Sequence, residues 1–245
     1  MPKLDDLNDY IWTAIHDNYL IYIVVTSSAE GKNPSSGFDY GVGKSTWTLG
    51  LLKFIYNGDE ELVKKNMCYF EEDIIDVLQR PGKTMAIGLE DMQIVFGKER
   101  SHDNQVKQLA NLLTGAREKV SVVVGNTPHL GKLASAWREL WMFEIKVYQR
   151  GYYEVQQVKH YTPFKDPYRV KEKLHYKGEA TFDIPSKELE DWYKPWRARK
   201  YAEAIRRYSS RYMPIPEPEL EPVPESEKSE AGRMLAEARW GRRDA

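Results

Sequence analysis

The chain has 245 residues, of which 41% are hydrophobic and 30% charged, a composition that supports a folded core and excludes a wholly disordered chain. Its 36 basic and 37 acidic residues nearly cancel, so net charge does not indicate a nucleic-acid partner, and its one cysteine excludes an internal disulfide. No apolar run approaches the roughly 20 residues of a membrane-spanning helix, and the opening MPKLDDLNDY lacks a secretory-signal pattern, so we expect a cytoplasmic chain without membrane insertion.

Short apolar segments alternate along the chain with segments of helical spacing. YLIYIVVT at 19–26 and VSVVV at 120–124 are rich in β-branched residues and apolar on both faces, which is typical of buried parallel strands. Strands are expected at about 19–27, 67–70, 84–90, 120–125 and 142–148. Helices are expected at about 44–56, 60–65, from 71 onward, 103–114 and 130–140. This alternation predicts an α/β fold with a central, mostly parallel sheet.

The C-terminal third carries weaker signals. Alternation around the turn residues 149–151 predicts a hairpin within 142–158. The segment 166–180 is dense in charged and turn-forming residues and favours neither helix nor strand. A helix is expected over 186–212, with Ser186 as its N-terminal cap and a break or kink at Pro195.

The last residues differ in composition from the rest. Five of the 13 prolines fall in PIPEPELEPVPESE, which predicts a disordered linker over 213–229. The peptide 230–245 has apolar residues at helical spacing and is expected either to dock on a protein partner or to be a solvated tail. We therefore expect a core at 1–165 and an extension at 166–212, followed by the linker and the peptide.

A glycine-containing loop lies between the first predicted strand and the next helix. It ends in Gly41, Val42, Gly43, Lys44, Ser45 and Thr46. Glycines let backbone N–H groups wrap around phosphates, the helix adds its positive N-terminal end, the lysine supplies a charge, and the serine hydroxyl can ligate Mg²⁺. These residues predict a phosphate-binding loop, although the full pattern has a glycine where Phe38 stands.

Two other predicted strands also end in polar residues. MAIGL is followed by Glu90 and Asp91, and VSVVVG by Asn126 and Thr127. Because ligands bind at the carboxyl ends of parallel strands, we expect these side chains to lie opposite the loop.

With these residues the chain resembles the P-loop NTPases. The resemblance implies a three-layer fold with sheet order 5-1-4-3-2, the RecA/AAA+ arrangement, plus the hairpin and C-terminal helix. It also implies ATP bound by the loop, with Mg²⁺ held by Ser45 and by one residue of the pair Glu90 and Asp91. The other carboxylate would orient water, and Asn126 would sense the γ-phosphate. The family order is Asp then Glu, which is reversed here, so the two roles stay open.

Over roughly residues 19–160 the chain is similar to small ATPases encoded by archaeal viruses and conjugative plasmids. The features that carry this likeness are the segment IYNGDEELVKKNMCYFEEDIIDVL after the loop, the two carboxylates that end the acidic strand, the turn Asn-Thr-Pro and the helix with Trp137-Arg138. This likeness implies replication, packaging or transfer of DNA by a homo-oligomer whose neighbouring subunit supplies an arginine, for which Arg138 and Arg117 are the candidates.

Basic and aromatic side chains alternate over 192–211, which favours either contact with DNA or a helix whose aromatics pack on the sheet. Two further functions stay open. One is a nucleotide-dependent switch without hydrolysis, favoured by Phe38 and by the reversed acidic pair. The other is a small-molecule kinase, for which the sequence shows no arginine-rich lid.

Overall fold

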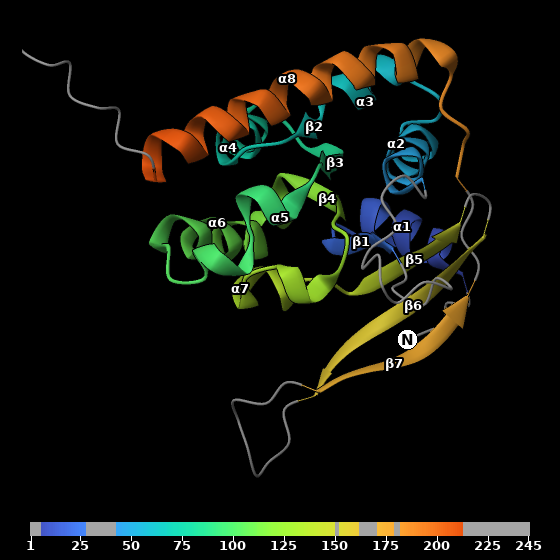
Figure 1. Cartoon of the computed structure of the whole chain (residues 1–245). Coiled ribbons are helices and arrows are strands. Elements are labelled where there is room, and N and C mark those ends of the chain that lie inside the picture. Colours follow the sequence, from blue (N-terminus) through green and yellow to red (C-terminus); the bar gives the residue numbers. More distant parts are fainter. Residues whose placement is uncertain (1–5, 28–42, 150–151, 162–170, 179–181, 213–245) are drawn as a thin grey trace, which may run out of the picture. The chain divides into compact units, whose positions relative to one another are not determined.

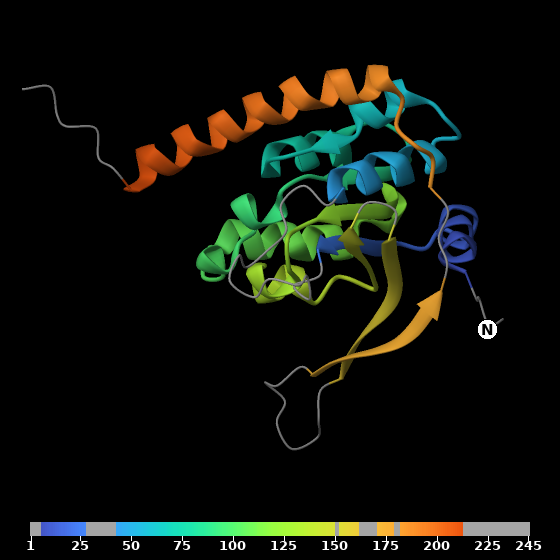
Figure 2. The same ribbon diagram turned by 45° about the vertical axis from the view of Figure 1, so that its right-hand side comes forward.

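The computed structural model describes residues 6–27, 43–149, 152–161, 171–178 and 182–212. They include a seven-stranded sheet with helices packed against it (Figure 1, Figure 2). The chain divides into two compact units, residues 1–200 and 201–245, and the sheet belongs to the first. The hairpin tip at 150–151 and the linker and terminal peptide at 213–245 lie outside the described residues. The domain boundaries drawn from the sequence stay a prediction.

The sheet has the predicted strand order, extended by two strands. The strands are β1 (Ile21–Ser27), β2 (Met67–Cys68), β3 (Thr84–Leu89), β4 (Val120–Asn126), β5 (Phe143–Gln149), β6 (Tyr152–Tyr161) and β7 (Lys171–Gly178). Their order is β2-β3-β4-β1-β5-β6-β7. Pairing is parallel from β2 to β5 and antiparallel from β5 to β7. The α/β class, the order 5-1-4-3-2 and the β5–β6 hairpin are therefore confirmed.

Strand β7 lies in the segment for which the sequence favoured no structure. It pairs with β6 from Tyr161↔Lys171 to Val155↔Gly178, with one irregularity after Gln156. Its sequence, KEKLHYKG, has little apolar content, which is typical of an edge strand protected by lysines rather than of a buried one.

The helices differ from the expectations in a few places. They are α1 (Leu7–His16), α2 (Lys44–Ile55), α3 (Glu60–Lys65), α4 (Glu71–Gln79), α5 (Met92–Val95), α6 (Asn104–Thr114), α7 (Ser135–Arg138) and α8 (Lys187–Tyr212), with 3₁₀ turns at Lys98–Arg100, Ala116–Glu118 and Leu130–Lys132. The single helix expected at 130–140 is wrong, because a 3₁₀ turn and the one-turn α7 take its place. A break or kink was expected at Pro195; the break is wrong, since α8 continues through that residue, and the kink stays a prediction. None of the described helices is long and apolar enough to cross a membrane.

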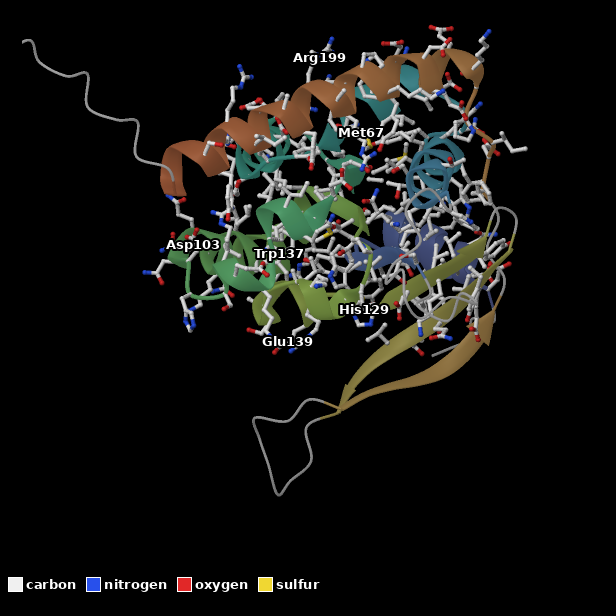
Figure 3. The ribbon with its side chains drawn as sticks, in the orientation of Figure 1. Met67, Asp103, His129, Trp137, Glu139 and Arg199 are labelled. Atoms are coloured by element: carbon white, nitrogen blue, oxygen red, sulfur yellow. The ribbon has the colours of Figure 1, made fainter. Side chains whose placement is uncertain are left out.

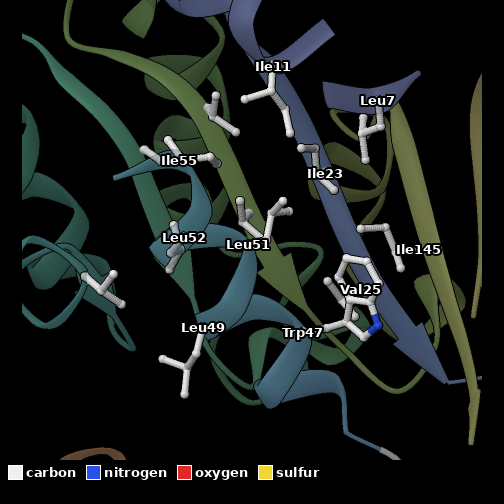
Figure 4. Packing of buried hydrophobic residues seen from close by; sticks show 14 of the residues in the cluster. Leu7, Ile11, Ile23, Val25, Trp47, Leu49, Leu51, Leu52, Ile55 and Ile145 are labelled. Carbon is white, nitrogen blue, oxygen red and sulfur yellow. The ribbon is translucent and has the colours of Figure 1, made fainter. Parts of the chain in front are cut away.

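Helices α1 and α2 pack on one face of the sheet. Trp47, Leu51 and Ile55 recur at four-residue spacing along α2 and are nearly or fully buried. Figure 4 shows Trp47 beside Val25 of β1, with Leu51 and Ile55 further along α2, and all of them belong to one buried cluster. Burial of each such side chain contributes about 1.5–3 kcal/mol. This packing fixes α2, and with it the end of the phosphate-loop motif, against the central strands.

Another cluster is centred on Trp137, labelled in Figure 3. Its ring is fully buried and stacks on Phe96 with centroids 3.8 Å apart. The indole Nε1–H donates to the Val106 carbonyl oxygen across 3.0 Å, which joins α7 to α6. The cluster holds the segments that follow β3 and β4, where the predicted site residues lie.

Candidate functional site at the carboxyl edge of the sheet

The start of α2 presents the described part of the glycine loop. Gly43 caps the helix with φ 102°, in the left-handed region that favours glycine. Lys44 is the first helical residue and is half-buried like Ser45, whereas Thr46 is exposed. Gly41 and Val42 lie outside the described residues, so the backbone cradle itself stays a prediction.

The acidic pair follows β3 directly, as its position after an apolar run predicted. Glu90 is 1% exposed, and the Ser45 hydroxyl donates to its Oε1 across 2.9 Å. Asp91 caps α5 with φ 46°, a left-handed conformation that non-glycine residues rarely adopt. Backbone strain of this kind recurs at functional sites.

Asn126 closes the arrangement from the end of β4. Its Nδ2 donates to Glu90 Oε2 across 2.7 Å, and its Oδ1 accepts from the Asp91 backbone N–H across 3.0 Å. The same Nδ2 lies 3.4 Å from the Thr48 hydroxyl of α2. Thr127, next in the chain, is buried and donates its backbone N–H to the Val25 carbonyl oxygen. Ser45, Glu90, Asp91 and Asn126 are thus brought together from three segments far apart in the sequence.

The carboxyl group of Glu90 is electrostatically unusual. Burial, followed by the neighbouring charge of Asp91, raises its pKa to about 7. The proton of this group is therefore held more tightly than in water, and a nearby cation would favour its release.

The sequence did not predict that α8 belongs to this site. Arg197 donates from Nε to Asp91 Oδ2 across 2.8 Å, and its Nη2 lies 2.6 Å from the same oxygen. Nε is also 3.4 Å from Glu90 Oε1. Burial acts to lower the pKa of Arg197, but the charges of Asp91 and its neighbours hold it above the ordinary value.

One turn earlier on α8, Tyr193 is buried with its hydroxyl against Glu90 and Ser45. That hydroxyl makes no hydrogen bond of normal geometry among the described residues. Their spacing of four residues predicts that Tyr193 and Arg197 share one helical face, but it does not indicate that this face meets the acidic pair.

The two arginines proposed from the sequence lie elsewhere in the chain. Arg138 is half-buried at the end of α7, and Arg117 lies on a 3₁₀ turn where it approaches Glu118 across 3.6 Å. Their expected role concerns a neighbouring subunit and stays a prediction.

The donor atoms fit Mg²⁺ held together with phosphates. Ser45, Glu90 and Asp91 offer hydroxyl and carboxylate oxygens, the ligands that this ion prefers. Within the described ranges no group of three or more His, Cys, Asp or Glu side chains could hold a metal. Mg²⁺ commonly takes one or two carboxylates and completes its shell with water and substrate phosphates, so Ser45, Glu90 and Asp91 are the residues that would hold it.

No protein-family model matches the sequence, and no curated protein matches it. Among solved structures, the chain is similar to the N-terminal domain of zonular occludens toxin from Neisseria meningitidis. The TM-score is 0.39 and the identity 11%, over 71% of this chain and 98% of that domain.

Proposed function

We propose that the protein binds and hydrolyses ATP with Mg²⁺ as a RecA/AAA+-like ATPase. The observation that carries the proposal is the contact of Glu90 with both Ser45 and Asn126, at 2.9 and 2.7 Å. A helix-start serine, a strand-end carboxylate and a polar residue on the adjacent strand are the parts that phosphoryl-transfer sites of this class combine.

In this proposal each residue has a distinct task. Lys44 and the N–H groups of residues 41–46 bind the phosphates, and Ser45 with Glu90 holds the metal, which when bound neutralises charge on the phosphates. The contact with Ser45 favours Glu90 over Asp91 as the metal carboxylate. Asp91 then orients the attacking water, and Asn126 contacts the terminal phosphate while fixing both acidic residues.

The test is nucleotide affinity and turnover in Lys44→Ala. We expect binding of a fluorescent ATP analogue to fall by at least about a hundredfold, because the lysine charge is removed from the phosphates. Lys107→Ala, which removes an exposed lysine from α6, is the matched control. Unchanged affinity in Lys44→Ala, with wild-type unfolding temperature, would contradict the proposal.

We propose further that hydrolysis serves DNA handling by a homo-oligomer. The sequence offered the basic and aromatic stretch 192–211 as support for DNA contact. In the structure this support is weaker, because Trp192, Tyr193 and Trp196 pack against the core. Lys194, Arg206 and the ring of Tyr201 are among the side chains of this stretch that stay exposed and would contact DNA. Stimulation of phosphate release by single- or double-stranded DNA, and a nucleotide-dependent mass increase, are the expected results.

A nucleotide-dependent switch is the second candidate. It is favoured by the close engagement of Asp91 by Arg197, which occupies the carboxylate that hydrolysis requires. Tight binding without turnover, with or without DNA, would favour the switch over the ATPase. Loss of ATP only in the presence of an acceptor would indicate the kinase.

A further inference from the structure

Helix α8 presents a row of polar side chains to the carboxyl edge of the sheet. Tyr193, Arg197 and Lys200 lie four and three residues apart, so they share one helical face. Lys200 Nζ contacts both oxygens of Asp73 at 2.8 and 2.9 Å, while Arg197 contacts Asp91 and Glu90. Each acidic side chain that this face meets is therefore paired with a cation from the helix.

The beginning of α8 is held independently of these contacts. The Ser186 hydroxyl donates to Glu60 Oε2 and accepts from the Leu189 backbone N–H, and Leu189 is fully buried. Lys53 and Glu60 form an ion pair of 2.8 Å beside this contact. The start of the helix is thus anchored, whereas the contact at Arg197 depends on a side chain that is 45% exposed.

We propose that α8 is an intrachain brake on the site, in which the Arg197 guanidinium takes the place of the divalent cation between Glu90 and Asp91. The proposal rests on the function proposed above. The guanidinium supplies a positive charge within 3.4 Å of one carboxylate and 2.6 Å of the other, which balances the pair without a metal. A cation that ligates Glu90 and Asp91 must compete with it for the same oxygens.

The Tyr193 hydroxyl lies against the same groups. It is buried beside Glu90 and Ser45, the two residues assigned to the metal, and its contact with Glu90 lowers the pKa of that carboxyl although the geometry is not that of a normal hydrogen bond. Displacement of Arg197 by a hydrated cation would therefore also change the surroundings of this hydroxyl.

The experiment compares Arg197→Gln with Arg199→Gln. Arg199 is exposed two residues further along and projects from α8 away from the sheet (Figure 3), so its loss changes net charge equally but leaves the acidic pair untouched. Binding of Mn²⁺ alone is measured by electron paramagnetic resonance, and binding of a fluorescent ATP analogue is measured with Mg²⁺ and with EDTA.

We expect Arg197→Gln to bind Mn²⁺ and the Mg²⁺-nucleotide about tenfold more tightly than wild type, with no gain in EDTA and no change in Arg199→Gln. Where the wild type binds nucleotide, equal or weaker Mg²⁺-nucleotide binding in Arg197→Gln overturns the brake, and weaker binding makes the arginine a phosphate ligand. If no variant binds nucleotide but Arg197→Gln gains Mn²⁺ affinity, the brake stands and the ATPase proposal fails. If neither ligand binds, both fail.

A second measurement uses the unmodified protein, in case the variant does not fold. Amide hydrogen exchange over residues 190–200 is followed with and without Mg²⁺ and a non-hydrolysable ATP analogue. Faster exchange on addition of the ligands supports the brake, because Arg197 then releases the acidic pair. Unchanged or slower exchange overturns it.

Discussion

Replacing Glu90 by glutamine should stabilise the protein at pH 8 in the absence of nucleotide. Burial and the charge of Asp91 raise the Glu90 pKa from 4.5 to about 7, which corresponds to about 3 kcal/mol disfavouring the ionised form in the folded state. The folded chain therefore retains a proton that the unfolded chain has released. The stability linked to Glu90 is fully present below pH 4.5, falls as the pH rises and is lost above about 7.

Glutamine is neutral at every pH and keeps the shape of the side chain. Its amide oxygen can accept from Asn126 and its NH₂ can donate to the Ser45 hydroxyl, while the weak contact with Arg197 is lost. We therefore expect a net gain of about 2 kcal/mol at pH 8 that disappears near pH 4.

The measurement is urea unfolding between pH 4 and 8, with Glu139→Gln as the control. Glu139 is exposed and labelled in Figure 3, so its substitution should leave stability unchanged. Equal or lower stability of Glu90→Gln at pH 8 would refute the argument, because the carboxylate would then be stabilised rather than penalised by its surroundings. If Glu90→Gln gains stability and loses ATP turnover, the Glu90 carboxylate is required for activity although it lowers the stability of the fold.

Three further changes test other parts of the structure. Gly50→Ala should destabilise the protein by about 1–3 kcal/mol in thermal unfolding, because the added Cβ would overlap the Asp183 carbonyl. Gly115→Ala is its control and should be neutral or slightly stabilising, because its Cβ would meet no heavy atom closer than 3.7 Å. Trp137→Phe should cost about 2–3 kcal/mol, because it leaves the buried acceptor of the indole N–H unpaired and opens a void; a loss under 0.5 kcal/mol would contradict the packing described. Ser45→Ala should weaken nucleotide binding at least about tenfold with Mg²⁺ and hardly at all in EDTA, whereas an equal loss in both conditions would argue against a metal contact.

The sheet was predictable because its signals are local. Strands β1 and β4 are short runs rich in β-branched residues, and β3 is a short, largely apolar run that follows a Pro-Gly turn, so their type and approximate bounds follow from the chain alone. The glycine loop, the acidic pair and Asn126 follow these strands, and parallel pairing brings strand ends to one edge. The arrangement of the site was thus inferable once the strand order was assumed.

The elements that were missed or misjudged have weak or misleading local signals. Strand β7 has an edge-strand composition and depends on pairing with β6 rather than on burial of its own residues. Helix α1 carried a readable signal, with Asp6 capping its N-terminus and Leu7, Ile11 and Ala14 buried at helical spacing, but it was not among the predicted helices. Helix α8 continues through Pro195 because tertiary contacts on both sides hold it: Leu189 and Tyr193 are buried before the proline, and Arg197 pairs with Asp91 after it.

The contact of Arg197 with the acidic pair could not be read from the sequence, because it joins residues 106 apart. Helical spacing groups Tyr193 with Arg197 but does not say what that face meets, and a basic, aromatic face suits either phosphates or carboxylates. The choice between them is made by the fold: Trp196 packs beside Tyr69, next to the start of α4, and this directs the guanidinium toward the end of β3. A positive charge from the C-terminal helix then meets the acidic edge that a cation would otherwise neutralise.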